Sequence, residues 1–432
     1  MAGYGSKMLE YGLYLLVFLL PLQTRYILKA GEIDGNYSEY LTYSIYATDL
    51  LLIGLLILKA LVLRSDGFSA LGVLKSRKFL MFFTILAVLL LSAQDRGLAA
   101  FGVFRIFLGF GLFSLVISAP RPHKILAAFL ASLFLQSAIG IYQFVLQESF
   151  VNKWLGMAFH APFNPGSPVI ETMDGRWLRA YGSLDHPNIL GVCLAVGLMF
   201  IVLSAIRHEK KDYIQMIFLS ALAPILSISL AFTFSRSAIV GLTAFYCLFI
   251  VLIYFCDKSR IKYIIVPIIA SLAAMGLIFI LFQDVALNRL HGGSRLEQRS
   301  LKERRGQYGD SLELIKRNMF FGVGVNNYVH ALKRNAPDQV DYFQPVHNTF
   351  LLVVSEIGVL GFILFLFYFF TTKYWKIFNN KQCLLLPVLL SFCVFFFLDH
   401  WFWSLHYGIL FISLSFGIFI NLINYQSSNL KL

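Results

Sequence analysis

The chain has 432 residues, of which 58% are hydrophobic and only 14% are charged, and its mean hydropathy is +0.72. Soluble domains usually carry about 25% charged residues, so this composition excludes an ordinary soluble enzyme and predicts a protein that lies mostly in lipid. The formal net charge is +13. In a soluble protein that charge would raise nucleic acid as a partner; in a membrane protein its distribution matters more, and we expect membrane lipids and no nucleic acid.

Apolar stretches long enough to cross a membrane run through almost the whole chain. A helix needs about 20 apolar residues to span a hydrocarbon core of roughly 30 Å. Twelve stretches meet this requirement: residues 8–28, 40–63, 77–93, 98–119, 124–147, 188–206, 214–234, 237–256, 261–282, 347–371, 382–399 and 402–424. The sequence therefore predicts an all-α, polytopic membrane protein with about 12 transmembrane helices, in which residues 1–432 form a single integral membrane domain.

Two segments between these predicted spans are long: residues 148–187, between helices 5 and 6, and residues 283–346, between helices 9 and 10. The short loops on the side of both termini carry more than twice as many Lys and Arg residues as the opposite set, leaving aside residues 283–346. Because Lys and Arg are retained on the cytoplasmic side in short loops, we expect both termini to be cytoplasmic. Both long segments then face outward.

The outward segment 283–346 carries a basic cluster between Arg295 and Arg305. Arginine presents a fork of donors that matches phosphate oxygens. The cluster therefore suggests an anionic, phosphate-bearing substrate at the outer leaflet. The alternative interpretation is a solvated basic surface held near anionic lipid headgroups.

Two arginines stand in apolar surroundings. Arg236 lies between the spans 214–234 and 237–256, and Arg105 lies within the span 98–119. An arginine left in hydrocarbon costs at least about 2.5 kcal/mol on insertion scales, so such a group usually faces a partner or a cavity. We interpret Arg236 as an anion-binding residue, with a snorkelling turn residue as the alternative. Arg105 fits a ligand contact or a structural pairing equally well.

Polar residues also gather at the predicted outer ends of the last spans. His347 and Asn348 follow the basic segment directly, and Asp399 and His400 lie between the last two spans. Imidazole titrates near neutrality, so His347 is a candidate general base, whereas a lone interfacial histidine is the structural alternative. Asp399 or His400 would orient a catalytic group.

Other patterns carry weaker signals. Residues 322–327 (GVGVNN) resemble a phosphate-binding glycine loop only superficially, and we expect a turn that returns the chain to the membrane. Glu32 and Asp34 could together hold a divalent ion, but a solvated loop explains them as well. No zinc-ligand spacing is present, and the five cysteines lie in apolar stretches. We therefore expect no metal.

Several motifs, taken together and in order, resemble those of the O-antigen ligase and O-antigen polymerase superfamily. They are residues 179–191 (RAYGSLDHPNILG), 235–241 (SRSAIVG), 322–328 (GVGVNNY), 347–351 (HNTFL) and 356–361 (EIGVLG). The similarity runs from about residue 175 to residue 365. The first five predicted spans add only a compatible topology.

This resemblance implies an inverting, metal-independent glycosyltransferase of the bacterial inner membrane with its active site facing the periplasm and without a cofactor. The implied donor is a glycan linked to undecaprenyl pyrophosphate. In a ligase the acceptor is a sugar hydroxyl of the lipid A core of lipopolysaccharide. In a polymerase the acceptor is another lipid-linked repeat unit.

The resemblance also implies roles for particular residues. Family ligases have essential arginines in the motif that Arg236 matches and near the start of the large periplasmic loop, and an essential histidine that His347 matches. We assign the loop arginine to Arg304, because Tyr308 follows four residues later and a helix-like run then begins. The expected roles are these: His347 is catalytic; Arg236, Arg304, Arg179 and Arg305 bind pyrophosphate; and Asn348, Arg105, Asp399 and His400 give support.

An O-antigen ligase is the first choice, and three alternatives remain. An O-antigen polymerase would use the same donor. A protein O-oligosaccharyltransferase would join the glycan to Ser or Thr. A lipid-linked oligosaccharide flippase would also need a cationic cavity, but it would not need a long one-sided loop that ends in a histidine.

Overall fold

The computed structural model describes residues 2–65, 87, 90–206, 213–335, 343–371 and 384–427, and these are mostly helical. A helix occupies each predicted span except residues 77–93, most of which lie outside the described residues. The long helices are α1 (Ala2–Leu19), α2 (Ala47–Ser65), α5 (Arg96–Ile117), α6 (Pro122–Leu146), α7 (Pro187–Ala205), α8 (Tyr213–Thr233), α9 (Arg236–Cys256), α10 (Ile261–Leu281), α12 (Arg295–Arg317), α14 (Thr349–Thr371), α15 (Leu385–Leu398) and α17 (His406–Ser427).

Shorter elements connect these helices. They are the helices α11 (Gln283–His291), α13 (Tyr328–Asn335) and α16 (Trp401–Ser404), the 3-10 turns η1 (Glu39–Leu41) and η2 (Lys258–Arg260), and the strands β1 (Arg25–Lys29), β2 (Glu32–Ile33), β3 (Asn36–Tyr37), β4 (Tyr43–Tyr46), β5 (Val169–Thr172) and β6 (Gly175–Leu178). The strands form three antiparallel two-stranded ribbons, β1 with β4, β2 with β3, and β5 with β6. The strictly all-α expectation is therefore wrong in these three places.

The β1–β4 ribbon also corrects two span boundaries. The predicted span 8–28 continues too far, because α1 ends at Leu19, close to Pro21, and β1 follows. The predicted span 40–63 starts too early, because α2 begins at Ala47, directly after β4. Arg25 lies near the end of the first apolar run, and Glu39 lies near the start of the next. The two residues form an ion pair at the ribbon, with Arg25 Nη2 2.7 Å from Glu39 Oε2. Runs of apolar residues conceal such a ribbon when they are judged by composition alone.

Among the described residues, five helices are long and apolar enough to cross a membrane, by length and composition: residues 96–117, 122–146, 187–205, 236–256 and 258–281. Every residue of α7 is buried, whereas only a third of the most apolar windows of α9 and α10 is buried. Phe255 and Ile280, for example, are 80% and 72% exposed. Large exposed apolar faces of this kind are expected where helices contact lipid.

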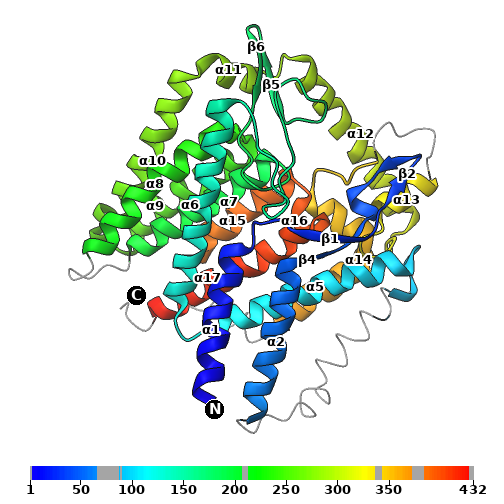
Figure 1. Ribbon diagram of the computed structural model, residues 1–432, viewed down its shortest axis with the longest axis horizontal. Helices are drawn as coiled ribbons and strands as arrows, with labels where there is room; N and C mark the ends of the chain where they lie inside the picture. Colours follow the sequence, from blue (N-terminus) through cyan, green and yellow to red (C-terminus); the bar gives the residue numbers. More distant parts are fainter. Residues whose placement is uncertain are drawn as a thin grey trace.

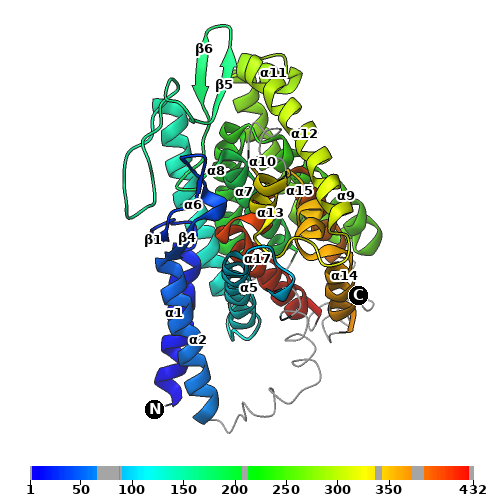
Figure 2. The same ribbon diagram turned by 90° about the vertical axis from the view of Figure 1, so that its right-hand side faces the viewer.

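The central helix α7 packs against α6, α8, α9 and α17, and α15 lies along α9. Figures 1 and 2 show α1 and α2 side by side at one edge, pointing away from the rest of the bundle. The β5–β6 ribbon and α11 contact each other at the end opposite the N-terminus. The two long segments between predicted spans therefore meet at one end of the molecule.

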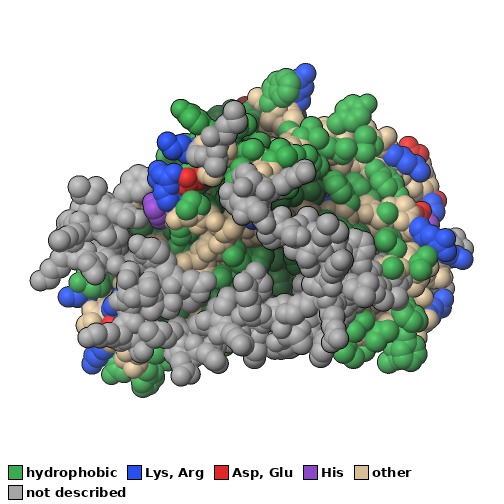
Figure 3. All heavy atoms as spheres, turned by 90° about the horizontal axis from the view of Figure 1, so that it is seen from below, with side chains coloured by type: hydrophobic (Ala, Val, Ile, Leu, Met, Phe, Trp, Pro, Cys, Tyr) green, Lys and Arg blue, Asp and Glu red, His purple; other side chains and the backbone are tan. Residues whose placement is uncertain are grey.

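The opposite end has a different surface. Viewed from the side on which α1 begins, the molecule is hollowed near its centre, and hydrophobic side chains line the visible part of the hollow (Figure 3). Lys and Arg side chains lie around the rim of this view. Basic residues at a rim of apolar side chains are the pattern expected where a bundle leaves the membrane.

Two glycines join the chain before α13 to a break in α14. Gly322 and Gly358 both have positive φ, +70° and +67°, and their backbones pack against each other. Gly324 N donates to Glu356 O at 2.8 Å, and Leu360 N donates to Phe320 O at 3.2 Å. The glycine segment 322–327 therefore packs on a helix break, in agreement with the turn expected from the sequence.

The side chain of Glu356 completes this junction. It accepts hydrogen bonds from Asn326 N at 2.8 Å, Tyr328 N at 3.2 Å and Trp403 Nε1 at 2.7 Å. One buried carboxylate thus ties α13, α14 and α16 together just below the start of α14. This junction fixes the position of the residues that precede α14, including His347.

We predict that Gly358→Ala destabilises the protein. Gly358 has φ +67° and ψ 174°, and a Cβ there would lie 2.3 Å from Phe320 O. This backbone region is essentially restricted to glycine, and strain there costs about 1–3 kcal/mol. Thermal unfolding in detergent should show a lower midpoint. Gly276→Ala is the matched control, because a Cβ at that helical position meets open space; an equal loss in both variants would contradict the proposed junction.

Candidate active site

Two arginines and one glutamate meet where α9, α11 and α12 begin or end. Arg236 opens α9, Arg289 lies in the last turn of α11, and Glu297 lies in the first turn of α12. Arg236 Nη2 is 2.9 Å from Glu297 Oε2, and Arg289 forms a closer ion pair with the other carboxylate oxygen of Glu297. Arg236 Nη1 also donates to Arg289 O at 3.2 Å. A single carboxylate is therefore shared between two guanidinium groups.

Arg304 lies seven residues after Glu297 on α12, so both side chains project from the same face of the helix. Its guanidinium is largely enclosed, and its Nε has no hydrogen-bond partner among the described residues. Burial lowers the pKa of Arg304, Arg236 lowers it further, and Asp399 opposes the shift. A buried donor without a partner costs roughly 1–3 kcal/mol, so this position is ready to accept an anionic ligand.

Arg179 stands behind this group and is 4% exposed. Its Nε donates to Thr233 O at 2.7 Å, and its Nη2 donates to Asn188 Oδ1 at 3.0 Å. Burial, together with the charges of Arg236 and Arg304, lowers the pKa of Arg179 to about 9. The guanidinium groups thus repel one another in a dry environment, and a bound anion would relieve that repulsion.

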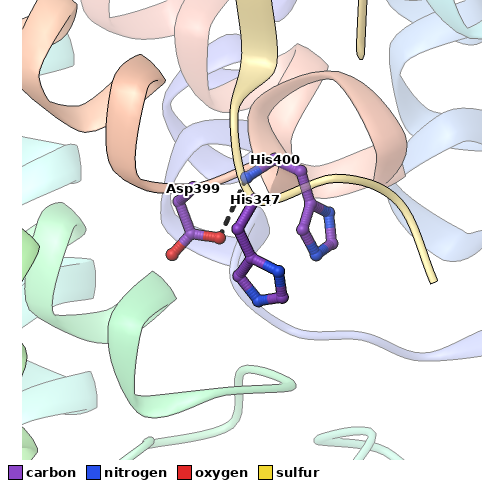
Figure 4. Close-up of side chains that lie close together, drawn as sticks. All are labelled: His347, Asp399 and His400. Carbon is purple, nitrogen blue, oxygen red and sulfur yellow. Dashed lines mark hydrogen bonds between the residues drawn. The ribbon is translucent and has the colours of Figure 1, made fainter. Parts of the chain in front are cut away.

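His347, Asp399 and His400 lie close together (Figure 4), and the charge of Arg304 lowers the pKa of both histidines. The His347 and His400 rings stand edge to face with centroids 4.8 Å apart. Asp399 Oδ1 accepts a hydrogen bond from His400 N at 3.0 Å, and Asp399 Oδ2 accepts one from Asn188 Nδ2 at 3.2 Å. Asn188 therefore links Asp399 to Arg179 and connects the imidazoles to the guanidinium groups.

The hydrogen bonds of His347 define which ring nitrogen is available. Its Nδ1 lies 2.8 Å from Gln307 Oε1 on α12. A carbonyl oxygen accepts only, so Nδ1 carries the proton and Nε2 keeps its lone pair. Burial and the charges of His400 and Arg304 lower the pKa of His347 to about 3, with Asp399 opposing them. The imidazole is therefore uncharged at neutral pH and can accept a proton.

His186 is a further member of this group, to which the sequence analysis assigned no role. Its Nδ1 accepts a hydrogen bond from Asn188 N at 3.1 Å, so it caps α7 and must carry its proton on Nε2. Burial lowers its pKa well below the usual range, and Arg179, His347, Arg289 and Arg304 lower it further. His186 is thus a neutral donor among the same charges.

The structure brings most of the predicted site residues together but not all of them. Arg305 is exposed, unlike its neighbour Arg304. Asn348 caps α14 through Leu351 N at 3.0 Å and donates to the Tyr308 hydroxyl at 3.3 Å. Arg105 lies in a separate place, with its guanidinium 4.4 Å from the centroid of the Phe101 ring.

Five residues of the site had no assigned role in the sequence analysis: Arg289, Glu297, Gln307, His186 and Asn188. His186 and Asn188 stand in the motif 179–191, which was a usable signal. Arg289 and Gln307 lie in polar sequence of the kind found in solvent-exposed helices, and no local pattern distinguishes them from their polar neighbours. The acidic residues Glu32 and Asp34, considered above as a site for a divalent ion, lie elsewhere, and Asp34 Oδ1 contacts Lys333 Nζ at 2.7 Å.

His347, Asp399 and His400 also form a set that could hold a metal ion, because one ligand atom from each lies within 4.8 Å of the others. Two imidazoles and a carboxylate are a donor set that zinc and other transition metals accept. His400 Nδ1 is already engaged with Ser404 Oγ at 2.7 Å, as His347 Nδ1 is with Gln307. Both Nε2 atoms are left for a metal, a substrate or a proton.

We predict that Arg304→Gln weakens binding of a polyanion such as inorganic pyrophosphate by about 10- to 100-fold, because a buried charge-assisted contact is lost. Isothermal titration of the purified protein measures this. The adjacent Arg305→Gln, which removes the same charge from an exposed position, should bind within about twofold of the wild type. Equal losses in both variants would show that net charge, and not the buried group, governs binding.

Residues 221–366 match the family model described as O-antigen ligase. The matched stretch begins in α8, ends in α14 and includes Arg236, Arg304 and His347. No curated protein and no solved structure matches the chain. The family consists of membrane glycosyltransferase-like enzymes. The match, which covers residues 221–366 of 432, supports the resemblance of the chain's motifs to those of the O-antigen ligase superfamily.

Proposed function

We propose that this protein is an O-antigen ligase, which transfers a glycan from undecaprenyl pyrophosphate to a sugar hydroxyl of the lipid A core. The observation that carries the proposal is a group of arginines with excess positive charge, one of which, Arg304, acts on the neutral imidazole of His347. The positive charge of three arginines, Arg236, Arg289 and Arg304, exceeds the negative charge of the carboxylates paired with them. His347 lies near this group, and its Nε2 lone pair is available.

The arginines would act on the donor. When the bond between the anomeric carbon and the phosphate oxygen breaks, the electron pair stays on the lipid pyrophosphate, which gains negative charge. Fixed guanidinium groups aimed at this oxygen stabilise the transition state because they need no rearrangement when the charge develops. Arg236 and Arg304 would contact the phosphates directly, whereas Arg179 is held by Thr233 O and Asn188 and would contribute mainly its charge.

His347 would act on the acceptor. Its Nε2 takes the proton of the attacking hydroxyl while the oxygen forms the new bond to the anomeric carbon, so the configuration at that carbon inverts. The low pKa of His347 in the empty site reflects burial and nearby cations. A bound pyrophosphate offsets those cations and raises the pKa towards the range in which imidazole is an effective base.

The proposal includes no metal ion. Its support is the chemistry of the arginines, which supply the positive charge that a divalent ion supplies in other phosphate-transfer sites. His347, Asp399 and His400 would then serve proton transfer and positioning. Because these three residues could hold a metal ion, a test of the function must include a sample with a chelator.

The proposal also places the site on the periplasmic side of the bacterial inner membrane, with both termini in the cytoplasm and about twelve spans. Two observations support this orientation. Lys and Arg are concentrated in the short loops on the side of the termini. The two long segments that carry the site meet at the end of the molecule opposite the N-terminus (Figures 1 and 2).

Reconstitution tests the function. Purified protein in nanodiscs is mixed with undecaprenyl-pyrophosphate-linked glycan and purified lipid A core, with and without EDTA. We expect a ladder of glycan on the core, inverted at the anomeric carbon, and equal rates in both samples. Chain growth on the carrier would identify a polymerase instead, and loss of the reaction in EDTA would assign a metal to His347, Asp399 and His400.

We predict that His347→Gln abolishes transfer but leaves donor binding nearly unchanged. A positioned general base contributes about 10²- to 10⁴-fold to the rate, whereas the phosphates would be held by arginines. Initial rates and donor binding are measured on the same sample. His330→Gln is the control, because His330 lies outside the site on α13. Normal transfer by His347→Gln would remove the base assignment.

A further inference from the structure

A second pocket lies next to the candidate active site, between the long segment that follows α6 and the start of α7. It has a volume of about 120 Å³, and its polar lining includes His160, Tyr181, Ser183 and Asp185. One wall is ordered by pairing within the segment, with Asn152 N donating to Met157 O at 3.0 Å and Ser149 N to His160 O at 2.9 Å. None of the residues in its lining was a predicted site residue.

Two polar groups of the pocket lack partners. Asp185 is exposed and lines the pocket, and no described residue donates a hydrogen bond to its carboxylate. The Tyr181 side chain is 5% exposed, and its hydroxyl has no hydrogen-bond partner among the described residues. The neighbouring Ser149 hydroxyl donates to Ala158 O at 2.8 Å instead. Both the carboxylate and the hydroxyl could therefore form hydrogen bonds with a ligand.

The pocket adjoins the candidate active site through two neighbouring residues, because Asp185 lines the pocket and His186 follows it in the chain. The charges that act most on His186 are Arg179, His347, Arg289 and Arg304. Those that act on Asp185 are Glu39 and Arg25, from the β1–β4 ribbon and its connection. The two adjacent residues are thus influenced by different sets of charges.

The chemistry of the lining restricts the ligand. The Asp185 carboxylate, with the negative charge of Glu39 acting on it, repels phosphates, but it accepts hydrogen bonds from hydroxyl groups. The Tyr181 and His160 rings, which stand edge to face at 5.4 Å, offer apolar surface beside those polar groups. Carboxylate acceptors next to aromatic rings suit a sugar, which has hydroxyl groups at its edge and C–H groups on its faces. An inverting displacement also requires the nucleophile to approach from the side opposite the leaving group.

We infer that this pocket binds a sugar ring of the acceptor, with Asp185 and Tyr181 hydrogen-bonded to its hydroxyl groups. The inference rests on the proposed function, since it places the pyrophosphate at the arginines and the attacking hydroxyl near His347. Asp185 and Tyr181 are positioning residues for the acceptor. A donor sugar has the same chemistry, so the experiment must distinguish the two sources.

The test compares Asp185→Asn and Tyr181→Phe with the wild type in nanodiscs, with the concentrations of donor and acceptor varied separately. We expect Asp185→Asn to raise the KM for lipid A core by about 10- to 100-fold and Tyr181→Phe by about 3- to 10-fold. The kcat at saturating acceptor and the KM for the donor should change by less than about twofold. Asp174→Asn is the matched control, because Asp174 is exposed in the turn between β5 and β6, and all its constants should match the wild type.

Direct binding of purified lipid A core without donor separates this inference from the proposed function. Weaker binding to Asp185→Asn than to the wild type supports the pocket even if the natural reaction differs. A raised KM for the donor alone would place a donor sugar in the pocket and overturn the inference. Wild-type transfer with unchanged acceptor constants in both variants would overturn it as well, while leaving the proposed function intact. A wild type that transfers no glycan would contradict the proposed function instead.

Discussion

The buried positive charge at the ends of α9, α11 and α12 is the constraint on which the rest of the site depends. Glu297 pairs with both Arg236 and Arg289, and Asp399 reaches Arg179 only through Asn188. Guanidinium groups stay charged at all physiological pH values, so the repulsion between them cannot be removed by loss of a proton. An enclosed site with excess positive charge is stabilised by a ligand with more than one negative charge.

The rest of the structure positions the imidazoles next to these charges. Glu356 joins α13, α14 and α16, and the close contact of Gly322 with Gly358 docks the preceding turn on the break in α14. His347 then emerges at a fixed point, where Gln307 sets its tautomer. The wholly buried α7 brings His186 and Asn188 to the same point from the other side. Helices α9, α11 and α12 carry Arg236, Arg289, Arg304 and Gln307, whereas the histidines and Asp399 lie in short connections next to helix ends.

Several details of this arrangement were predictable and others were not. Arg236 was identified because a charged residue between two apolar spans needs a partner, and Arg304 was chosen over Arg305 by its distance from Tyr308. Arg289, Gln307 and Asp185 were not assigned roles, since in polar sequence one arginine, glutamine or aspartate looks like another. The ribbon between β1 and β4 was missed for the opposite reason, because apolar composition hid two strands within predicted spans.

The sequence by itself determined that lipid is the main solvent, that helices dominate, and which residue types and motifs carry the chemistry. Hydropathy and motif order are properties of the linear chain, so they can be read without coordinates. Only the tertiary structure decided which of the many cations share one enclosed space, which nitrogen of His347 is available, and that Asp185 faces a separate pocket. The hydrogen bonds of the site join residues on different elements, from 40 positions apart for His347 and Gln307 to 211 for Asn188 and Asp399, and these contacts exist only after the helices have packed.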